Sequence, residues 1–316
     1  MAAPARSIKW DGRQITKPGL YAGIGLDLYH SQKICDGPSV SSSGLRKLFS
    51  ESPAHFYETW DGNPNRVEPK DKAHFSLGRA LHHLMLGEPF FAKLFCIQPD
   101  EYESDKGELK PWSNNAIKCK EWNAARKTEG RTILTSDHVE TIKGMAKKLG
   151  SHPIVKAGAL NGDIERSGFY KDKETGLWVK WRPDSIPGDS GDFVDLKTTI
   201  SVKWEELART IFDYGYHQQL ALIRSGARAI GIPFSSATLI FVEKTNPYCV
   251  RVVTIKDVDL DRGEKANRVA LDAMAECLKR KHWPGPGGDR EDAEHIELQE
   301  WAQKKIDDRL RYGIPT

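Results

Sequence analysis

Closely spaced cysteine pairs are missing from this chain of 316 residues. Its five cysteines are scattered, and no two of them form a CxxC motif. This spacing argues against a zinc ribbon and against a cysteine-ligated iron–sulfur cluster. An odd number of widely separated cysteines is typical of reduced thiols, so a cytoplasmic protein is expected.

Long hydrophobic runs and a strong net charge are missing as well. No apolar run approaches about 18 residues, so no membrane span is predicted. The first residues, "MAAPARSIKWDG", have no apolar core, so no signal peptide is predicted. The formal net charge is only +3, and any site for a polyanion must therefore be a local patch.

What the chain does contain is the pattern of an α/β (α+β) protein. Residues 1–40 are rich in Gly and Pro, and we expect them to form an extended arm. Helices are predicted after a serine cap near Ser41, followed beyond residue 160 by three strands, one long helix and two more strands. This order predicts a mixed central sheet flanked by helices in one domain, residues 41–285, with an amphipathic tail at 286–316.

The stretch "WRPDSIPGDSGDFVDLKTT" carries the first candidate site. Side chains alternate along a strand, so Asp195 and Lys197 share a face while Val194 and Leu196 point into the core. A hairpin through "PGDSG" would bring Asp184 beside Asp195. Two close carboxylates repel each other unless a cation lies between them, and oxygen ligands suit Mg²⁺ or Mn²⁺. Lys197 would then position a water molecule and stabilise developing charge.

The alternative for this stretch is an ordinary solvent-facing hairpin. Asp-x-Lys is a common pattern, and Lys197 could simply be a salt-bridge partner of Asp184 and Asp195. Pro183, the short hairpin and the apolar backing of the strand favour a recessed site.

Further polar residues are candidates for the same site. In "LGRALHHLML", His82 lies one helical turn after Gly78, which leaves room over it, whereas His83 shares a wetter face with Arg79. A lone histidine on such a helix is more often structural, so His82 becomes a metal ligand only alongside the aspartates. Glu165, which precedes the hairpin, either joins the site or lies on the surface.

A second helix contributes a tyrosine and a glutamine. In "DYGYHQQLALI", Tyr216 and Gln219 are spaced i, i+3 and share one face. They could bind a phosphate or orient the water. Core packing is the alternative for Tyr216, although it explains Gln219 less well.

These motifs, taken in order, resemble a known family. "SSSGLRKLFSESPAHF", "LGRALHHLML", "ERSGFYKDKETGLWVKWRPDSI", "FVDLKTT", "YGYHQQLALI" and "FVEKTNPY" follow the order seen in RecE-like (exodeoxyribonuclease VIII-type) phage exonucleases. These enzymes belong to the PD-(D/E)XK superfamily, with lambda exonuclease and the RecB nuclease domain. The resemblance covers residues 40–285 and implies a restriction-endonuclease-like core. The site it implies consists of His82, Glu165, Asp184, Asp195, Lys197, Tyr216 and Gln219.

The resemblance also implies an activity. It implies a Mg²⁺-dependent exonuclease (Mn²⁺ being the other possible ion) that degrades linear double-stranded DNA from the 5′ end and leaves a 3′ overhang. It further implies a trimeric or tetrameric ring around the DNA and a single-strand annealing protein as partner. In this picture His82, Asp184 and Asp195 hold the metal, with Glu165 completing the shell. The alternatives are a structure-specific endonuclease on the same fold, or a non-catalytic DNA-binding module.

Two positions depart from the family pattern. Ile223 stands where a tyrosine often follows the glutamine, and "WPGPGG" lacks the usual aromatic residue. The first departure concerns substrate contacts more than metal chemistry. Possible phosphate contacts, for each of which a solvated surface position is the alternative, are Ser43, Arg46, Arg79 and Arg182.

Overall fold

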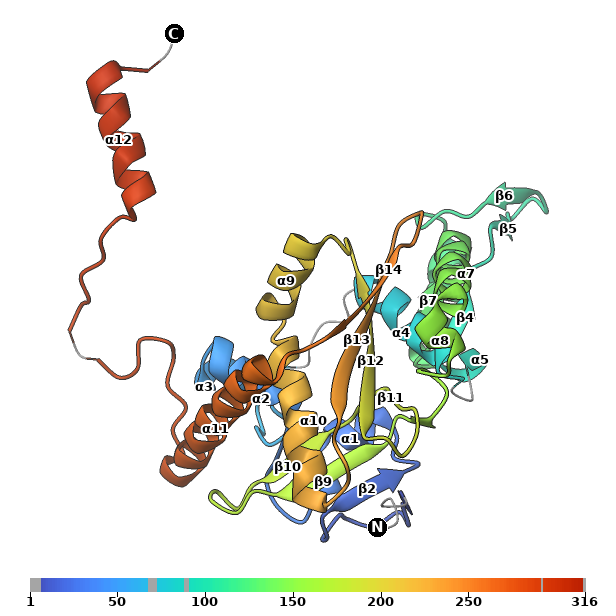
Figure 1. The fold of residues 1–316 in the computed structure, drawn as a ribbon. Helices are drawn as coiled ribbons and strands as arrows, with labels where there is room; N and C mark the ends of the chain where they lie inside the picture. Colours follow the sequence, from blue (N-terminus) through green and yellow to red (C-terminus); the bar gives the residue numbers. More distant parts are fainter. Residues whose placement is uncertain (1–6, 68–72, 88–90, 291, 315–316) are drawn as a thin grey trace.

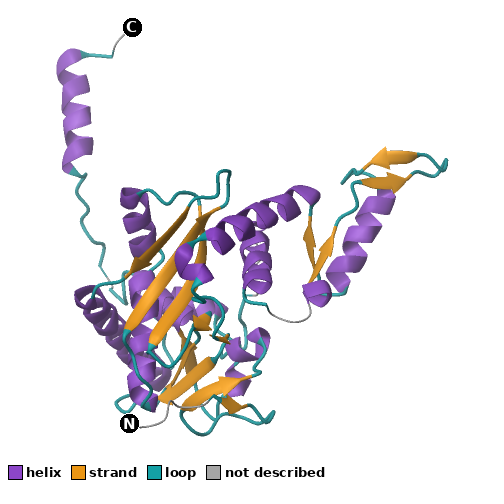
Figure 2. Ribbon diagram, turned by 45° about the vertical axis from the view of Figure 1, so that its right-hand side comes forward, coloured by secondary structure: helices purple, strands orange, loops and turns teal. Residues whose placement is uncertain are grey.

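The structure is a computed structural model that describes residues 7–67, 73–87, 91–290 and 292–314. Two five-stranded sheets form its framework (Figures 1 and 2). The central sheet consists, in spatial order, of β14 (Val250–Thr254), β13 (Ser236–Glu243), β12 (Asp192–Thr199), β11 (Ser185–Ile186) and β8 (Asp163–Ile164). The second sheet consists of β1 (Ile8–Lys9), β2 (Gly19–Ala22), β9 (Ser167–Lys171), β10 (Trp178–Trp181) and β3 (Ser39–Ser41).

The central sheet is mixed, as predicted. Strand β12 pairs antiparallel with β11 and parallel with β13. Both faces of β12 are covered, because Phe193 packs into one hydrophobic cluster while Val194 and Leu196 pack into another. The face that carries Asp195 is therefore lined by apolar side chains too, whereas the sequence had placed the core on the opposite face only. A strand buried on both faces is usual where helices cover a sheet with parallel strands.

The expected N-terminal arm is more regular than predicted. Strand β1 pairs with β2, β2 pairs with β9, and β3 pairs with β10, so three short strands within residues 7–41 belong to the second sheet. Tyr21, Phe169 and Trp178 pack together in a separate hydrophobic cluster. The signal was missed because two- to four-residue strands show too little alternation to be recognised.

The predicted three-strand meander is divided between the two sheets. Strands β9 and β10 form a hairpin in the second sheet, whereas β11 pairs with β12 in the central one. The chain changes sheets at Arg182 and Pro183. Proline has no amide hydrogen to donate to a strand ladder, which is consistent with a break at this point.

The helices lie around the sheets, apart from α12 near the C-terminal end (Figure 1). They are α1 (Leu26–His30), α2 (Ser42–Ser50), α3 (Pro53–Thr59), α4 (Ala73–Met85), α5 (Phe91–Leu94), α6 (Ile117–Thr128), α7 (Ser136–Ser151), α8 (Pro153–Lys156), α9 (Trp204–Asp213), α10 (Tyr216–Ile230), α11 (Asp257–Arg280) and α12 (Glu300–Tyr312), with a 3₁₀ turn η1 (Gln32–Ile34). Four short strands form two further small sheets: β4 (Phe95–Ile97) pairs with β7 (Thr132–Leu134), and β5 (Glu101–Glu103) pairs with β6 (Leu109–Pro111).

The long helix predicted after β12 is in fact two helices. Gly215 adopts a left-handed conformation with φ of 61° and separates α9 from α10. Glycine takes this conformation without steric cost, which explains the break. As a result, Tyr216 occupies the first position of α10 rather than the middle of a continuous helix.

Trp181 joins the second sheet to α10, and two glycines make room for it. A Cβ atom on Gly168 would lie 2.0 Å from the indole ring, and one on Gly226 would lie 2.2 Å from it. Trp181 is only 1% exposed, so the ring has little space to move. We expect Gly226→Ala to lower the free energy of unfolding by about 1–3 kcal/mol, the usual effect of overpacking a core.

Urea unfolding of the full chain measures this loss, and Gly150→Ala is the matched control. Gly150 is also helical, in α7, but a Cβ atom there would meet nothing within 4 Å. Alanine has the higher helix propensity, so the control should be neutral or stabilising. Equal destabilisation by both substitutions would contradict the packing argument.

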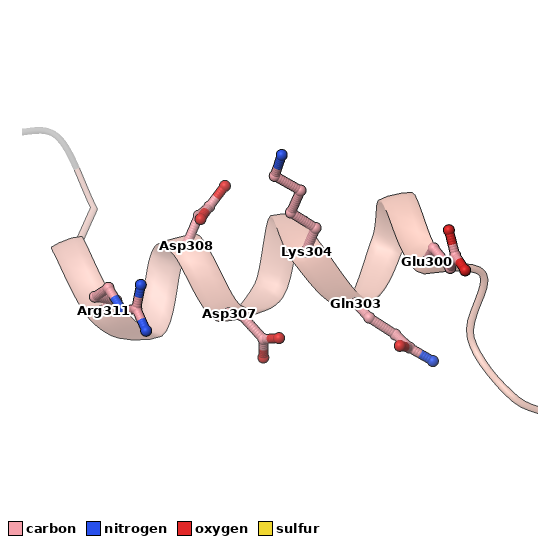
Figure 3. A pocket seen from close by; sticks show the side chains of 6 residues that line it. All are labelled: Glu300, Gln303, Lys304, Asp307, Asp308 and Arg311. Carbon is pink, nitrogen blue, oxygen red and sulfur yellow. The ribbon is translucent and has the colours of Figure 1, made fainter.

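The tail helix α12 stands away from the body of the protein (Figure 1) and has no buried residue. A surface hollow there is lined by Glu300, Gln303, Lys304, Asp307, Asp308 and Arg311 (Figure 3). These side chains come from a single helix and project to different sides of it, so they do not converge on a ligand. No helix in the described part of the chain is both long enough and apolar enough to span a membrane.

Candidate active site

The hairpin of β11 and β12 brings the two aspartates together. Ser185 pairs with Val194, and the same antiparallel register places Asp184 opposite Asp195. Because β11 is so short, the edge of β12 continues beyond it, and the Asp184 carboxylate accepts a hydrogen bond of 2.6 Å from the Leu196 amide on that edge. Both aspartates are buried, at 8% and 1% exposure. The geometric part of the prediction for this stretch is confirmed.

Two residues from elsewhere in the chain meet Asp184. His82 of α4 places Nδ1 3.4 Å from Oδ2 of Asp184. Glu165 follows β8 in a left-handed conformation with φ of 52°, and its amide donates to the Asp184 carbonyl at 3.1 Å. One potential ligand atom from each of His82, Glu165 and Asp184 lies within 4.8 Å of the other two.

Glu165 is held in place by an arginine. Its carboxylate accepts a hydrogen bond from Nε of Arg182. Nη1 of Arg182 also donates to the Ile24 carbonyl at 3.1 Å and to Ser167 Oγ at 3.3 Å. Through Arg182, these contacts fix the orientation of Glu165 relative to the second sheet. They help to stabilise the left-handed backbone conformation of Glu165, which is unfavourable for a residue other than glycine.

A second group of contacts surrounds Asp195. Its Oδ2 forms an ion pair with Lys197 and accepts a hydrogen bond of 2.8 Å from Nε2 of Gln219. Tyr216 lies beside Lys197, whose Nζ is 5.3 Å from the centre of the ring. The tyrosine and the glutamine predicted to face the site therefore do so.

The charges of the site follow from burial and from these neighbours. Burial raises the pKa of Asp184 well above its ordinary value, and the nearby Asp195 raises it further. Burial, with the positive charge of Lys197, lowers the pKa of His82 to about 4. The imidazole is thus neutral at neutral pH, which is the form that binds metals.

Lys197 behaves in the opposite way. Burial alone would lower its pKa, but the negative charges of Asp195 and Asp184 outweigh burial and raise it. Lys197 is therefore a fixed positive charge at neutral pH, suited to binding an anion and unsuited to accepting a proton.

The donor set fits a divalent metal ion. Two carboxylates and one neutral imidazole converge from three elements, and oxygen-rich sets of this kind suit Mg²⁺ or Mn²⁺. A bound cation would also remove the repulsion between buried carboxylates that otherwise raises the pKa of Asp184. Asp195 is not part of the cluster formed by His82, Glu165 and Asp184. Its ion pair with Lys197 and its hydrogen bond from Gln219 both use Oδ2.

The predicted phosphate contacts lie in different surroundings. Arg182 donates its hydrogen bonds to Glu165, to the Ile24 carbonyl and to Ser167. Arg79 is exposed and donates to Thr132 at 3.1 Å, and Ser43 is exposed with its Oγ 3.1 Å from that of a neighbouring serine. Arg46 donates through Nη1 to the carbonyl of Tyr214, two residues before Tyr216 in the chain. Their contacts with DNA stay predictions.

Two details of α4 differ from the sequence interpretation. His83 is buried beside the stacked rings of Phe91 and Phe95 and does not lie on a wet face. Gly78 gives room to Thr198 of β12, whose Oγ1 would lie 3.3 Å from an added Cβ atom, and does not give it to His82. Both follow from the packing of α4 against the central sheet, which the helix periodicity alone does not reveal.

Sequence reasoning missed Tyr214. Its ring stacks on that of Tyr216, with 5.6 Å between centres and an angle of 15° between planes. The signal was present as "YGY", because a glycine within a predicted helix can mark its end and so place the two aromatic residues on a turn.

Comparison with solved structures shows the fold. A protein from Eubacterium rectale, provisionally described as an exonuclease, matches with a TM-score of 0.56 and 14% identity, over 93% of this chain and 100% of that one. An alkaline exonuclease from Laribacter hongkongensis matches with a TM-score of 0.25 and 14% identity, over 54% and 87%. A phage-related exonuclease from Haemophilus somnus matches with a TM-score of 0.29 and 11% identity, over 64% and 94%. Only the first is similar enough to carry an argument, and it shows a shared fold.

Sequence comparison shows the family. A search of curated proteins finds no match. A family model described as a PDDEXK-like domain of unknown function (DUF3799) matches residues 41–296, well over half of the chain. The predicted PD-(D/E)XK fold is confirmed. The chain therefore belongs to this PDDEXK-like family.

Proposed function

We propose that this protein is a metal-dependent exonuclease that hydrolyses linear double-stranded DNA from the 5′ end and leaves 3′ single-stranded overhangs. The observation that carries the proposal is the convergence of His82, Glu165 and Asp184 beside Lys197, at one edge of β12. Family membership supports a nuclease-like fold, and the order of the sequence motifs supports the exonuclease class.

In this proposal His82, Glu165 and Asp184 hold the metal ion. A divalent cation bound there would polarise the phosphate and lower the pKa of a water ligand. Arg182 keeps Glu165 oriented, and the Leu196 amide keeps Asp184 oriented. If Asp195 also binds the ion, it would do so through Oδ1, because Lys197 and Gln219 both contact Oδ2.

Lys197 supplies positive charge to the phosphate that is cut. Its ammonium group is held by Asp195 and lies beside the Tyr216 ring, so its position is preorganised. Preorganised charge in a recessed site stabilises the charge that develops on the phosphate oxygens. Gln219 fixes the Asp195 carboxylate and can orient the attacking water.

Two further parts of the proposal rest on the family resemblance. We propose that the protein acts as a ring-shaped trimer or tetramer around DNA, with Mg²⁺ as the physiological ion. We also propose that a single-strand annealing protein receives the 3′ overhang for recombination. Sedimentation of the protein with and without DNA tests whether it forms a trimer or tetramer.

Digestion of end-labelled DNA tests the activity. A linear duplex carrying a label at either the 5′ or the 3′ end, and a covalently closed circle, are incubated with the full chain in Mg²⁺ or in EDTA. We expect early release of the 5′ label from linear DNA in Mg²⁺ alone, with the circle left intact.

The other outcomes discriminate between the alternatives. Nicking of the closed circle would identify an endonuclease on the same fold. Early release of the 3′ label would reverse the proposed polarity. Binding of DNA without cutting in either Mg²⁺ or Mn²⁺ would favour a DNA-binding module and contradict the proposed chemistry.

A further inference from the structure

An exposed aromatic ring continues the active site toward solvent. Tyr214 is 61% exposed, although its ring stacks on Tyr216 at 5.6 Å. Tyr216 in turn lies against Lys197 and Phe241, which are paired neighbours on β12 and β13. A continuous path of contacts therefore leads from the Asp195–Lys197 pair to an open aromatic surface.

The backbone that carries Tyr214 is held firmly. Arg46 of α2 donates a hydrogen bond to the Tyr214 carbonyl. Gly215 then turns the chain through its left-handed conformation, and a Cβ atom there would lie 2.9 Å from Cδ of Arg46. Tyr214 thus has an anchored backbone and an exposed side chain, which is unusual for a ring whose role is core packing.

We propose that Tyr214 is a stacking platform for an unpaired base of the DNA strand that is being cut. This inference rests on the proposed function and extends it, because it specifies that the site receives a strand whose end has separated from its complement. Tyr214 touches the base, while Lys197 and the metal-binding residues act on the phosphate.

The chemistry of the surface favours a base as its occupant. Bases stack readily on exposed aromatic rings, and such stacking tolerates any sequence. Lys197 and Arg46 add positive charge next to the rings, which suits the phosphates that flank the stacked base. Inside a duplex both faces of a base are covered by its neighbours, so stacking on Tyr214 requires a base at the end or out of the helix.

A double-mutant cycle between the protein and the DNA tests this contact. Binding is measured by fluorescence anisotropy in EDTA, so that no DNA is cut, with the full chain and with Tyr214→Ala. The probe is a labelled linear duplex whose cut strand ends in a short unpaired flap, with each flap base replaced in turn by an abasic site. The cycle isolates the energy between one side chain and one base.

With the unchanged protein, we expect one abasic position to weaken binding by about 5- to 150-fold, the range typical of one stacked base. With Tyr214→Ala, the same abasic position should cause no further loss. Tyr214→Phe keeps the ring and should restore the original behaviour, which a purely structural role of the hydroxyl would not.

Phe212→Ala is the matched control. Phe212 is exposed on the same segment, at 75%, and no ring contact is recorded for it among the described residues. It should leave the coupling unchanged. Independent effects of the abasic site and Tyr214→Ala, or equal coupling with Phe212→Ala, would overturn the assignment.

The result separates this inference from the proposed function. Cutting of linear DNA without coupling at Tyr214 would reject the platform and leave the nuclease in place. Coupling without cutting in Mg²⁺ or Mn²⁺ would support the platform and reject the nuclease. Failure of the unchanged protein to bind the flapped duplex would overturn both.

Discussion

Replacing Lys197 with alanine is expected to reduce the rate of DNA cleavage by about 10²–10³-fold, the usual effect of removing one preorganised group that stabilises transition-state charge. Lys197 is recessed, paired with Asp195 and kept protonated by its acidic neighbours. No other described lysine pairs with Asp195. The measurement is kcat on end-labelled linear DNA at saturating substrate.

Two variants control for this substitution. Lys197→Arg keeps the charge but changes its geometry, and it should retain part of the activity. Lys203→Ala removes an exposed lysine close in sequence, and it should cleave as the unchanged protein does. Full cleavage by Lys197→Ala would contradict the role given to this residue.

The stability of Lys197→Ala is a separate expectation. Asp195 is 1% exposed and would lose its cationic partner, and breaking a buried ion pair from one side costs about 3–5 kcal/mol. Cleavage is therefore measured well below the melting temperature of the variant, with folding verified by circular dichroism. Asp195→Asn combined with Lys197→Ala removes the unpaired charge and should recover stability but not cleavage.

Replacing Asp184 with asparagine is expected to abolish cleavage while making the metal-free protein no less stable. Asp184 is buried beside Asp195, so its charge is unfavourable when no cation is bound. Asparagine keeps an oxygen for the hydrogen bond from the Leu196 amide and removes that charge. We expect the melting temperature in EDTA to stay constant or rise by about 2–4 °C.

Mg²⁺ should distinguish the two proteins. A ligand that binds only the folded state raises the melting temperature, so Mg²⁺ should stabilise the unchanged protein and have little effect on Asp184→Asn. The control is Asp192→Asn. Asp192 is the first residue of β12, its carboxylate accepts hydrogen bonds from Ser190 and Ser236, and the variant should keep the response to Mg²⁺. A large drop in melting temperature for Asp184→Asn in EDTA would contradict the electrostatic argument.

The proposed site is thus poorly stabilised by its own charges. Asp184 and Asp195 repel each other, and Asp184 is held by a backbone amide on a strand edge. Such an arrangement is costly for folding and useful for binding a cation, which is the usual relation between stability and function at an active site.

The sequence by itself determined the local part of this site. Alternation along a strand has a period of two, and the turn "PGDSG" is short, so the pairing of Asp184 with Asp195 follows from local rules. The same holds for Tyr216 and Gln219, since a spacing of three residues places side chains on one face of any helix. The mixed central sheet was also predictable, because its longer strands are strongly apolar.

Only the tertiary structure decided which distant groups join this hairpin. His82 approaches because α4 packs on the central sheet, and Glu165 is aimed by Arg182, which is itself bound to the N-terminal part of the chain through Ile24. Periodicity carries no information about such docking, and long polar side chains take their direction from their partners. The backbone of Tyr214 is likewise held from a distance, since Arg46 of α2 donates a hydrogen bond to its carbonyl.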